Sequence, residues 1–194
     1  MKRPDFIEVF ARHRGSIPTI TGPGLVSREL FAMTGDDPTV LYNMEMPYAT
    51  PMCLGLAMAR PRQRIVALEG DGSLISALGI LTTVARYRPP NLTIIVLDNE
   101  SFSTFGAGII SATARGVDLA AVSRGCGIET TISVTTLQAA ETALPKVLHE
   151  AGPWVLVAKV DAQSEPDPRF VRSSPDVTEQ SLDFARMLRG NGGT

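Results

Sequence analysis

The chain has 194 residues, of which 44% are hydrophobic and 20% charged, and its formal net charge is −2. This length fits one domain with a buried core, and this charge provides no basic field for nucleic acid or for an anionic membrane surface. No apolar run approaches the roughly 18 residues of a membrane span. Because Cys53 and Cys126 are too few and too far apart for a zinc or iron–sulfur site, we expect free thiols and a cytoplasmic protein.

Short β-rich runs alternate with helical stretches along the chain. Strands are predicted over 16–21, 39–42, 64–70, 92–98, 127–133 and 154–160, and helices near 5–13, 25–33, 49–59, 74–86, 117–124 and 135–149. The runs at 64–70 and 92–98 are apolar almost throughout, which is typical of strands covered on both faces. We therefore expect an α/β domain over 1–161, doubly wound, with a mostly parallel sheet and helices on both faces.

The C-terminal segment 162–194 differs in character from the rest of the chain. It begins with a stretch rich in prolines and charges, which indicates a surface segment. Ser174-Pro175-Asp176 is typical of a helix start, and 177–189 is predicted to form a last amphipathic helix. The segment is expected to be an appendage to the domain and not a second domain.

Polar residues follow the two buried strands at the point where each strand ends. Gly70-Asp71-Gly72 closes the first, with Ser73 opening the next helix, and Asp98-Asn99 closes the second. One strand–helix–strand unit spans the interval between Asp71 and Asn99, so the two side chains should converge beyond the carboxyl edge of the sheet. A carboxylate, an amide oxygen and a nearby backbone carbonyl are hard ligands that suit Mg²⁺. An acidic turn with a structural Asn cap is the plainer alternative.

The pattern Gly70-Asp71-Gly72, followed after residues 73–97 by Asp98-Asn99, resembles the motif of thiamine diphosphate-dependent enzymes. Asp98 replaces the first Asn of that motif and leaves the ligating second Asn in place. The resemblance implies that Asp71, Asn99 and the carbonyl of Ser101 hold Mg²⁺ and that Ser73 contacts the diphosphate. It extends from about Gly22 to Val160 and is greatest for the diphosphate-binding subunits or halves of sulfopyruvate and phosphonopyruvate decarboxylases.

Two further segments fit this resemblance. In the stretch 43–59, Met46 stands where the family places the apolar residue that forces the bent shape of the cofactor; ordinary core packing is the alternative. Glu45 and Pro47 depart from the small residue and the glycine that are usual there. In the stretch 21–30, Gly24 and Ser27 fit the loop beside the diphosphate, although Ser27 could equally be a helix N-cap. The implied cofactor-binding set is completed by Asn43, Met44, Glu45, Gly70, Gly72, Phe102 and Ser103.

The loop after Asn99 should border the reactive end of the cofactor. Ser103 and Thr104 could bind a substrate anion there, or could stabilise the turn. Enzymes of this family also need a glutamate that activates the pyrimidine ring, and that glutamate belongs to a separate pyrimidine-binding domain. No carboxylate of this chain, Glu45, Glu69 and Glu100 included, matches that glutamate. The resemblance therefore implies half of an enzyme, completed by a pyrimidine-domain subunit, most simply as a heterotetramer.

The implied function is that of a diphosphate- and Mg²⁺-binding subunit of a split thiamine diphosphate-dependent decarboxylase acting on a small 2-oxo acid. A carboligase that forms acetolactate or an acyloin would use the same cofactor machinery and stays open. A non-catalytic module that binds a nucleotide or another cofactor is the alternative from a different class. Magnesium-dependent binding of thiamine diphosphate, set against binding of adenine nucleotides, distinguishes this module from the enzyme.

Overall fold

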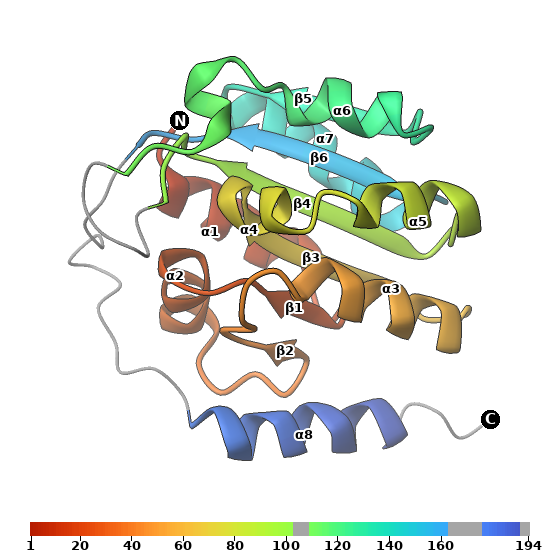
Figure 1. Ribbon diagram of the computed structural model, residues 1–194. Coiled ribbons are helices and arrows are strands. Elements are labelled where there is room, and N and C mark those ends of the chain that lie inside the picture. The colour runs from red at the N-terminus through yellow and green to blue at the C-terminus, as the bar shows by residue number, and fades with distance from the viewer. Residues whose placement is uncertain (103–108, 163–175, 191–194) are drawn as a thin grey trace.

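A computed structural model describes residues 1–102, 109–162 and 176–190 (Figure 1). Within this part of the chain, six parallel strands form one sheet in the order β2-β1-β3-β4-β6-β5. The strands are β1 Thr19–Thr21, β2 Val40–Leu41, β3 Ile65–Gly70, β4 Leu92–Asp98, β5 Thr131–Val134 and β6 Trp154–Lys159. The predicted α/β class and parallel sheet are confirmed.

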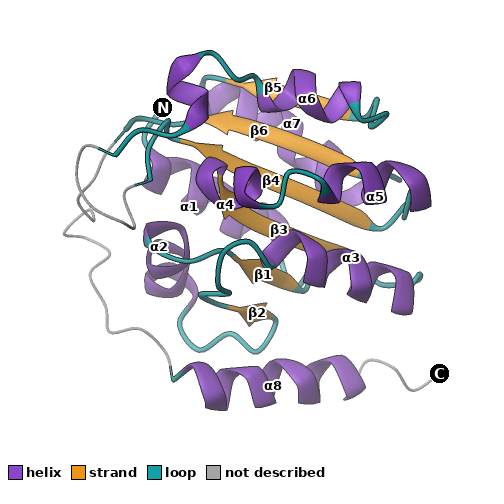
Figure 2. Cartoon of the chain, viewed as in Figure 1, coloured by secondary structure: helices purple, strands orange, loops and turns teal. Residues whose placement is uncertain are grey.

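Helices cover both faces of the sheet (Figure 2). They are α1 Arg3–Arg14, α2 Leu25–Thr34, α3 Ala49–Ala59, α4 Asp71–Ser76, α5 Ile80–Tyr87, α6 Leu119–Gly125, α7 Leu137–His149 and α8 Val177–Gly190, with a 3-10 helix, η2, over Ala112–Arg115. Successive residues of β3 face opposite sides, so Val66 joins a core with α1, α2 and α7 while Ala67 joins a second core with α3 and α5. This two-sided burial explains why the central strands are apolar almost throughout.

The prediction of a single helix over 74–86 is wrong, because this stretch forms two helices, α4 and α5. The chain leaves α4 at Ala77 and begins α5 at Ile80. The Ser76 hydroxyl donates to the carbonyl of Gly72, and such bonding to the preceding turn competes with regular helix in this region. Leucine and isoleucine on nearly every side of 74–86 also predict a helix that is buried all round, and this is wrong: Leu74 and Leu81 are buried, but Ile75, Leu78 and Ile80 are partly exposed.

Two predicted strands are shorter or shifted. The strand expected over 127–133 begins only at Thr131, because Gly127 has a φ of +98° and the chain is still turning away from α6 there. The strand expected over 16–21 begins at Thr19, after a turn in which the amide of Ile17 donates to the carbonyl of Arg14. The remaining predicted strands and helices are present with small shifts at their ends, and η2 was not foreseen.

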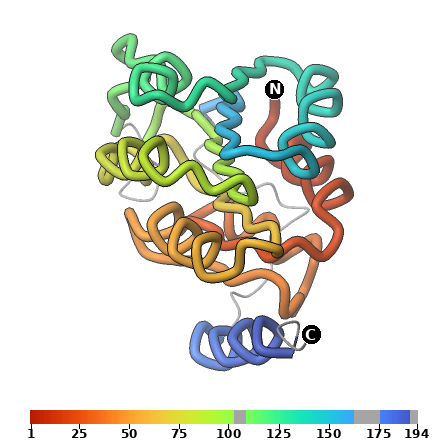
Figure 3. Tube along the Cα trace, turned by 90° about the vertical axis from the view of Figure 1, so that its right-hand side faces the viewer, coloured from red at the N-terminus to blue at the C-terminus, as the bar shows by residue number. Residues whose placement is uncertain are grey.

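The last helix, α8, lies along the outer edge of the sheet beside β2, as two views at right angles show (Figures 1 and 3). The side-chain oxygen of Gln180 accepts a hydrogen bond from the backbone amide of Tyr42, at 3.1 Å. Phe184 and Leu188 are buried in the core that contains α3. The predicted helix over 177–189 is therefore confirmed, and it packs against the domain. None of the helices in the described ranges is long and apolar enough to cross a membrane.

Candidate functional site

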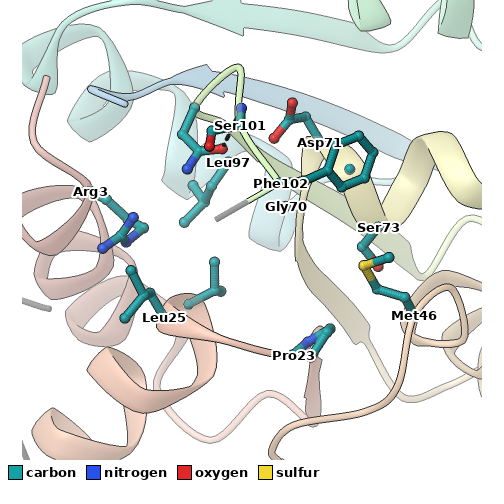
Figure 4. Close-up of a pocket in the computed structure, with 13 residues that line it drawn as sticks. Arg3, Pro23, Leu25, Met46, Gly70, Asp71, Ser73, Leu97, Ser101 and Phe102 are labelled. Atoms are coloured by element: carbon teal, nitrogen blue, oxygen red, sulfur yellow. Dashed lines mark hydrogen bonds between the residues drawn. The ribbon is translucent and has the colours of Figure 1, made fainter. Parts of the chain in front are cut away.

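A pocket lies at the carboxyl ends of β1, β3 and β4 (Figure 4). Strand β1 pairs with β2 on one side and with β3 on the other, so the chain reverses its direction of winding here. Ligands of open α/β sheets bind at such a switch point. The cavity measures about 50 Å³. It is lined by Arg3, Pro23, Leu25, Val26, Met46, Gly70, Asp71, Gly72, Ser73, Leu97, Asn99, Ser101 and Phe102.

Asp71 is the carboxylate of this pocket and is only 1% exposed. Its Oδ2 accepts hydrogen bonds from the hydroxyls of Ser111 and Thr113, the latter at 2.8 Å. Its Oδ1 is buried and has no hydrogen-bond partner in the described residues. Burial raises the pKa of Asp71, the two hydroxyls lower it in part, and the nearby charge of Asp98 raises it further. A buried carboxylate with one oxygen held and one left over suits a metal ion, because buried acceptors otherwise find a partner.

The loop after β4 brings Asn99 and Ser101 to the same pocket. The side-chain oxygen of Asn99 accepts a hydrogen bond from the amide of Ser101, at 3.2 Å. Between them Glu100 has a φ of +59°, a conformation that is uncommon outside glycine and turns the loop sharply. The carbonyl of Glu100 then accepts from the amide of Ser111, at 3.0 Å. The Asn99–Ser101 loop and the hydroxyls that hold Asp71 are thus parts of one hydrogen-bonded unit.

Glycine is required at position 72 by its neighbour Phe102. A Cβ added to Gly72 would lie 2.5 Å from the Phe102 ring. The ring therefore packs directly against the backbone at the start of α4, and Figure 4 shows it beside Asp71 on the pocket wall. This contact gives the second glycine of the Gly70-Asp71-Gly72 sequence a steric reason, because Gly72 lies in α4 without a positive φ.

Ser73 lines the pocket, but its hydroxyl donates to a buried carboxyl group. The acceptor is Oε2 of Glu69, at 2.5 Å, and the hydroxyl of Thr50 donates to the other oxygen of the same group. Glu69 is fully buried, and burial raises its pKa, while the two hydroxyls lower it in part. Gly22 packs on this group, because a Cβ there would lie 2.9 Å from that of Glu69. Glu69 ties β1, β3, α3 and α4 together below the pocket.

Met46 reaches the pocket from the loop before α3, on the side of Ser73 and Pro23 (Figure 4). It is partly buried and is followed by a cis bond to Pro47. Asn43 and Glu45 of the same loop are exposed, and Met44 packs against the core below α3. Met46 is thus the residue of this loop that lines the pocket.

The structure brings together most of the predicted site. The residues that line the pocket are Met46, Gly70, Asp71, Gly72, Ser73, Asn99, Ser101 and Phe102, and those outside its lining are Gly24, Ser27, Asn43, Met44 and Glu45. The amide of Gly24 lies 3.4 Å from the side-chain oxygen of Asn43, so these two meet beside the pocket. Ser27 is not an N-cap, because Gly24 holds that position and Ser27 is buried within α2. Ser103 and Thr104 fall outside the described residues.

Several residues at the site were not predicted. Arg3 of α1 lines the pocket, and its guanidinium forms two 2.8 Å bonds with the buried carboxylate of Glu29. Ser111 and Thr113 hold Asp71 from about 40 positions away, and no spacing rule links them to it. The sequence gives one indication that Glu69 is structurally important: it is a charged residue inside an otherwise apolar strand, and such a residue needs a partner when it is buried.

Asp98, which ends β4, has a different set of contacts from Asp71. Its Oδ2 lies 2.7 Å from the ammonium nitrogen of Lys159, at the end of β6, and its Oδ1 accepts from the amide of Glu100 at 3.2 Å. Lys159 also lies 3.3 Å from a carboxylate oxygen of Glu100. Partial burial lowers the pKa of Lys159, but the two carboxylates outweigh it and the pKa is raised, so the lysine is a cation.

The fold and the pocket define an α/β domain with a ligand pocket at the switch point of its parallel sheet, and comparisons with known proteins show which family it belongs to. The family model described as "Thiamine pyrophosphate enzyme, C-terminal TPP binding domain" matches residues 27–158. The chain belongs to this family. It is a thiamine diphosphate-binding domain, and the resemblance predicted from its motifs is confirmed.

Individual relatives narrow the comparison. The chain is 27% identical to sulfopyruvate decarboxylase subunit beta of Methanocaldococcus jannaschii, over 84% of this chain and 86% of that one. It is 33% identical to phosphonopyruvate decarboxylase of Streptomyces viridochromogenes, over 79% of this chain but only 39% of that one. Among solved structures, benzoylformate decarboxylase of Polynucleobacter necessarius has a TM-score of 0.67 at 16% identity, covering 86% of this chain and 34% of that one. At 16% identity, the similarity to the benzoylformate decarboxylase structure shows a shared fold and nothing more.

Proposed function

We propose that this chain is the diphosphate- and Mg²⁺-binding subunit of a split thiamine diphosphate-dependent decarboxylase that acts on a small 2-oxo acid. The observation that carries the proposal is the pocket at the switch point of the sheet, where the unpartnered Oδ1 of Asp71 lies beside the Asn99–Ser101 loop. The similarity to a decarboxylase beta subunit over most of both chains supports it.

The residues present fit the cofactor and its ion. Asp71 Oδ1, the side chain of Asn99 and the carbonyl of Ser101 would hold Mg²⁺, and the turn at Gly72 would let the diphosphate approach the backbone. Met46 would contact the rings of the cofactor from the far side of the pocket. When bound, thiamine diphosphate accepts the electron pair that remains when carbon dioxide leaves a 2-oxo acid. This chain's contribution to that chemistry is to hold the cofactor and to fix its conformation.

For Ser73 we propose a supporting role beside the predicted contact with the diphosphate. Because its hydroxyl proton is directed at Glu69, the hydroxyl can offer a diphosphate only its lone pairs unless that bond rearranges. The backbone amides at the start of α4 are therefore the better donors for the anion. We propose that Ser73 supports the Gly70–Gly72 turn through Glu69 in addition to lining the site.

A second subunit is proposed on three observations. The cavity of about 50 Å³ is far below the roughly 300–1,000 Å³ of typical ligand pockets. Asp71, proposed as a metal ligand, is the one carboxylate among the described residues that line it. Large apolar side chains are exposed on the loops and helices next to the pocket, namely Tyr48, Met52, Ile109 and Ile110, each at 40–55%. Such a surface indicates a protein interface.

The partner proposed for this surface is a chain that carries a pyrimidine-binding domain and its activating glutamate. A heterotetramer of two chains of each kind is the simplest assembly. The names of relatives in which this region is called subunit beta imply such a partner for those proteins. We also propose the cytoplasm as the compartment, because Cys53 and Cys126 are free thiols.

Sulfopyruvate and phosphonopyruvate are the proposed substrate class, since the relatives with 27% and 33% identity are named for them. The test is release of carbon dioxide from these acids, pyruvate and benzoylformate by the purified chain, alone and with its co-purifying subunit. We expect turnover only in the pair, with added Mg²⁺ and thiamine diphosphate. Turnover by this chain alone would contradict the split enzyme, and absence of magnesium-dependent cofactor binding in the pair would contradict the function itself.

Carboligation is the second candidate, because acetolactate synthase isozyme 1 large subunit of Escherichia coli is 23% identical over 129 residues. Both reactions begin with loss of carbon dioxide and differ in the fate of the product. If the pair consumes two molecules of 2-oxo acid for each carbon–carbon bond formed, the carboligase replaces the decarboxylase.

A further inference from the structure

Asp98 and Asp71 occupy equivalent places at the ends of neighbouring strands. Gly70 of β3 is in register with Leu97 of β4, and each aspartate is the next residue of its chain. Both carboxylates are about 1% exposed. Two buried carboxylates at the same level of a sheet repel each other and a diphosphate, so the negative charge of Asp98 needs compensation at this edge.

Lys159 provides that compensation from the neighbouring strand on the other side. Asp98 of β4 is in register with Lys159 of β6, which places the ammonium nitrogen 2.7 Å from Oδ2. The Asp98 side chain is fully buried and the Lys159 side chain is 36% exposed, so this is not a solvated surface pair. Loss of the lysine would leave a carboxylate buried without a counter-ion, which is far costlier than loss of a surface ion pair.

The same two groups shape the loop that carries the proposed metal ligands. The amide of Glu100 donates to Asp98 Oδ1, while the Glu100 carboxylate lies 3.3 Å from Lys159. Lys159 thus contacts the residues immediately before and after Asn99. The loop between them adopts the positive φ at Glu100 that turns Ser101 back toward Asn99.

We propose that Lys159 is a positioning residue for the cofactor site: it neutralises Asp98 and fixes the Asp98–Glu100 turn, so that Asn99 and Ser101 face the metal and the diphosphate. The inference rests on the proposed function. It also accounts for the departure of Asp98 from the Asn-Asn motif, because an aspartate at this position is compatible with a bound diphosphate when a lysine pairs with it. An asparagine at 98 would make the lysine dispensable.

The test is a double-mutant cycle on the complex of this chain with its co-purifying subunit. Affinity for thiamine diphosphate at saturating Mg²⁺ is measured by calorimetry, at a temperature where circular dichroism shows every variant folded. Lys159→Met should weaken binding about 10–100-fold, the usual effect of losing a group that orients metal ligands. Lys159→Arg should retain most of the affinity. In the Lys159→Met background, Asp98→Asn should recover most of the lost affinity for thiamine diphosphate. Asp98→Asn alone should change that affinity less than about threefold.

Lys146→Met is the matched control, because it removes the same charge from α7 near Trp154, at the opposite end of β6. It should leave cofactor affinity unchanged. If Lys159→Met lowers Tm but binds the cofactor as the wild type does, Lys159 is only structural and the inference fails. If Asp98→Asn does not rescue Lys159→Met, charge compensation is likewise refuted. If the wild-type complex itself shows no magnesium-dependent binding, it is the proposed function that fails.

Discussion

Asp71 and Asp98 are the same residue type at the ends of adjacent strands, yet their surroundings differ. Asp71 is held by two neutral hydroxyls, from Ser111 and Thr113, and keeps one oxygen without a partner among the described residues. Asp98 is paired with a lysine that takes up its charge. Hydroxyls orient a carboxylate but leave its charge uncompensated, whereas an ammonium group orients the carboxylate and also neutralises its charge. We infer that the partners of a buried carboxylate, more than its position at a strand end, decide whether it is free to bind a metal ion.

Neutralising each aspartate in turn tests whether their different surroundings give them different roles. Asp71→Asn should weaken magnesium-dependent binding of thiamine diphosphate more than about 100-fold, because a proposed metal ligand loses its charge. Asp98→Asn serves as the matched variant and should stay near wild-type affinity. Calorimetry on the complex with the partner measures both. Equal losses in the two variants would show that the surroundings do not separate their roles.

The second variant removes the hydroxyls that hold Asp71. Replacing Ser111 by Ala and Thr113 by Val together should weaken Mg²⁺-dependent binding about 10–100-fold, since the carboxylate loses the groups that orient it. Without those hydroxyls the pKa of Asp71 should rise further, so the loss should grow as the pH falls and protons compete with Mg²⁺. Binding isotherms at several pH values measure this. Ser181→Ala, which removes an exposed hydroxyl in α8, is the control. An equally large loss of Mg²⁺-dependent binding in that variant would refute the role given to Ser111 and Thr113.

The third variant concerns the opposite wall of the pocket, where no charge is involved. Met46→Ala should slow hydrogen–deuterium exchange at the reactive carbon of bound thiamine diphosphate about tenfold, while its affinity changes little, because the diphosphate end is untouched. Met46→Leu, which conserves volume, should exchange at a rate near the wild type. Exchange is followed by NMR after acid quench. Equal exchange rates in Met46→Ala and in the wild type would return Met46 to ordinary packing.

The smallest effect is expected at Glu69, another buried carboxyl group near the pocket. Its pKa in the folded state is raised from its ordinary value of 4.5, so the folded protein holds this proton more tightly than the unfolded chain. The resulting stabilisation is present below that value and is lost as the pH rises through the folded pKa. Glu69→Gln keeps a donor and an acceptor for Thr50 and Ser73 but cannot ionise. Its Tm relative to wild type should therefore be higher at pH 8 than at pH 5, by roughly 2–4 °C. If the Tm difference between Glu69→Gln and the wild type does not vary with pH, the raised pKa of Glu69 in the folded protein is contradicted.

The sequence predicted what depends on local pattern. Continuous apolar runs predicted β3 and β4, and glycine, aspartate and asparagine at their ends predicted the convergence of Asp71 with Asn99. What it could not predict depends on contacts between distant segments. The hydroxyls of Ser111 and Thr113 lie at Asp71, about 40 positions away in the chain, and the amide of Ser111 donates to the carbonyl of Glu100. Lys159 meets Asp98 only because β6 inserts between β4 and β5.

The errors have a similar cause. Periodicity over 74–86 indicated one buried helix, because apolar residues on every side look the same whether they face a core or another protein. The structure ends α4 early and leaves Ile75, Leu78 and Ile80 partly exposed. The alternative of an N-cap at Ser27 was wrong because α2 begins at Leu25, with Gly24 in the N-cap position three residues before Ser27.

The hydrogen bond between Gln180 and the backbone of Tyr42 has a consequence for how the molecule behaves in a crowded solution. The outermost strand of an open sheet offers its unpaired amides to any extended segment that approaches, including the same strand of another molecule. Here the backbone amide of Tyr42, the residue just after β2, donates to the side-chain oxygen of Gln180. The apolar side of α8 covers the adjoining surface. We therefore expect the C-terminal helix to hinder association through this edge, and a chain truncated before Asp176 should form more oligomer than the full chain in light scattering.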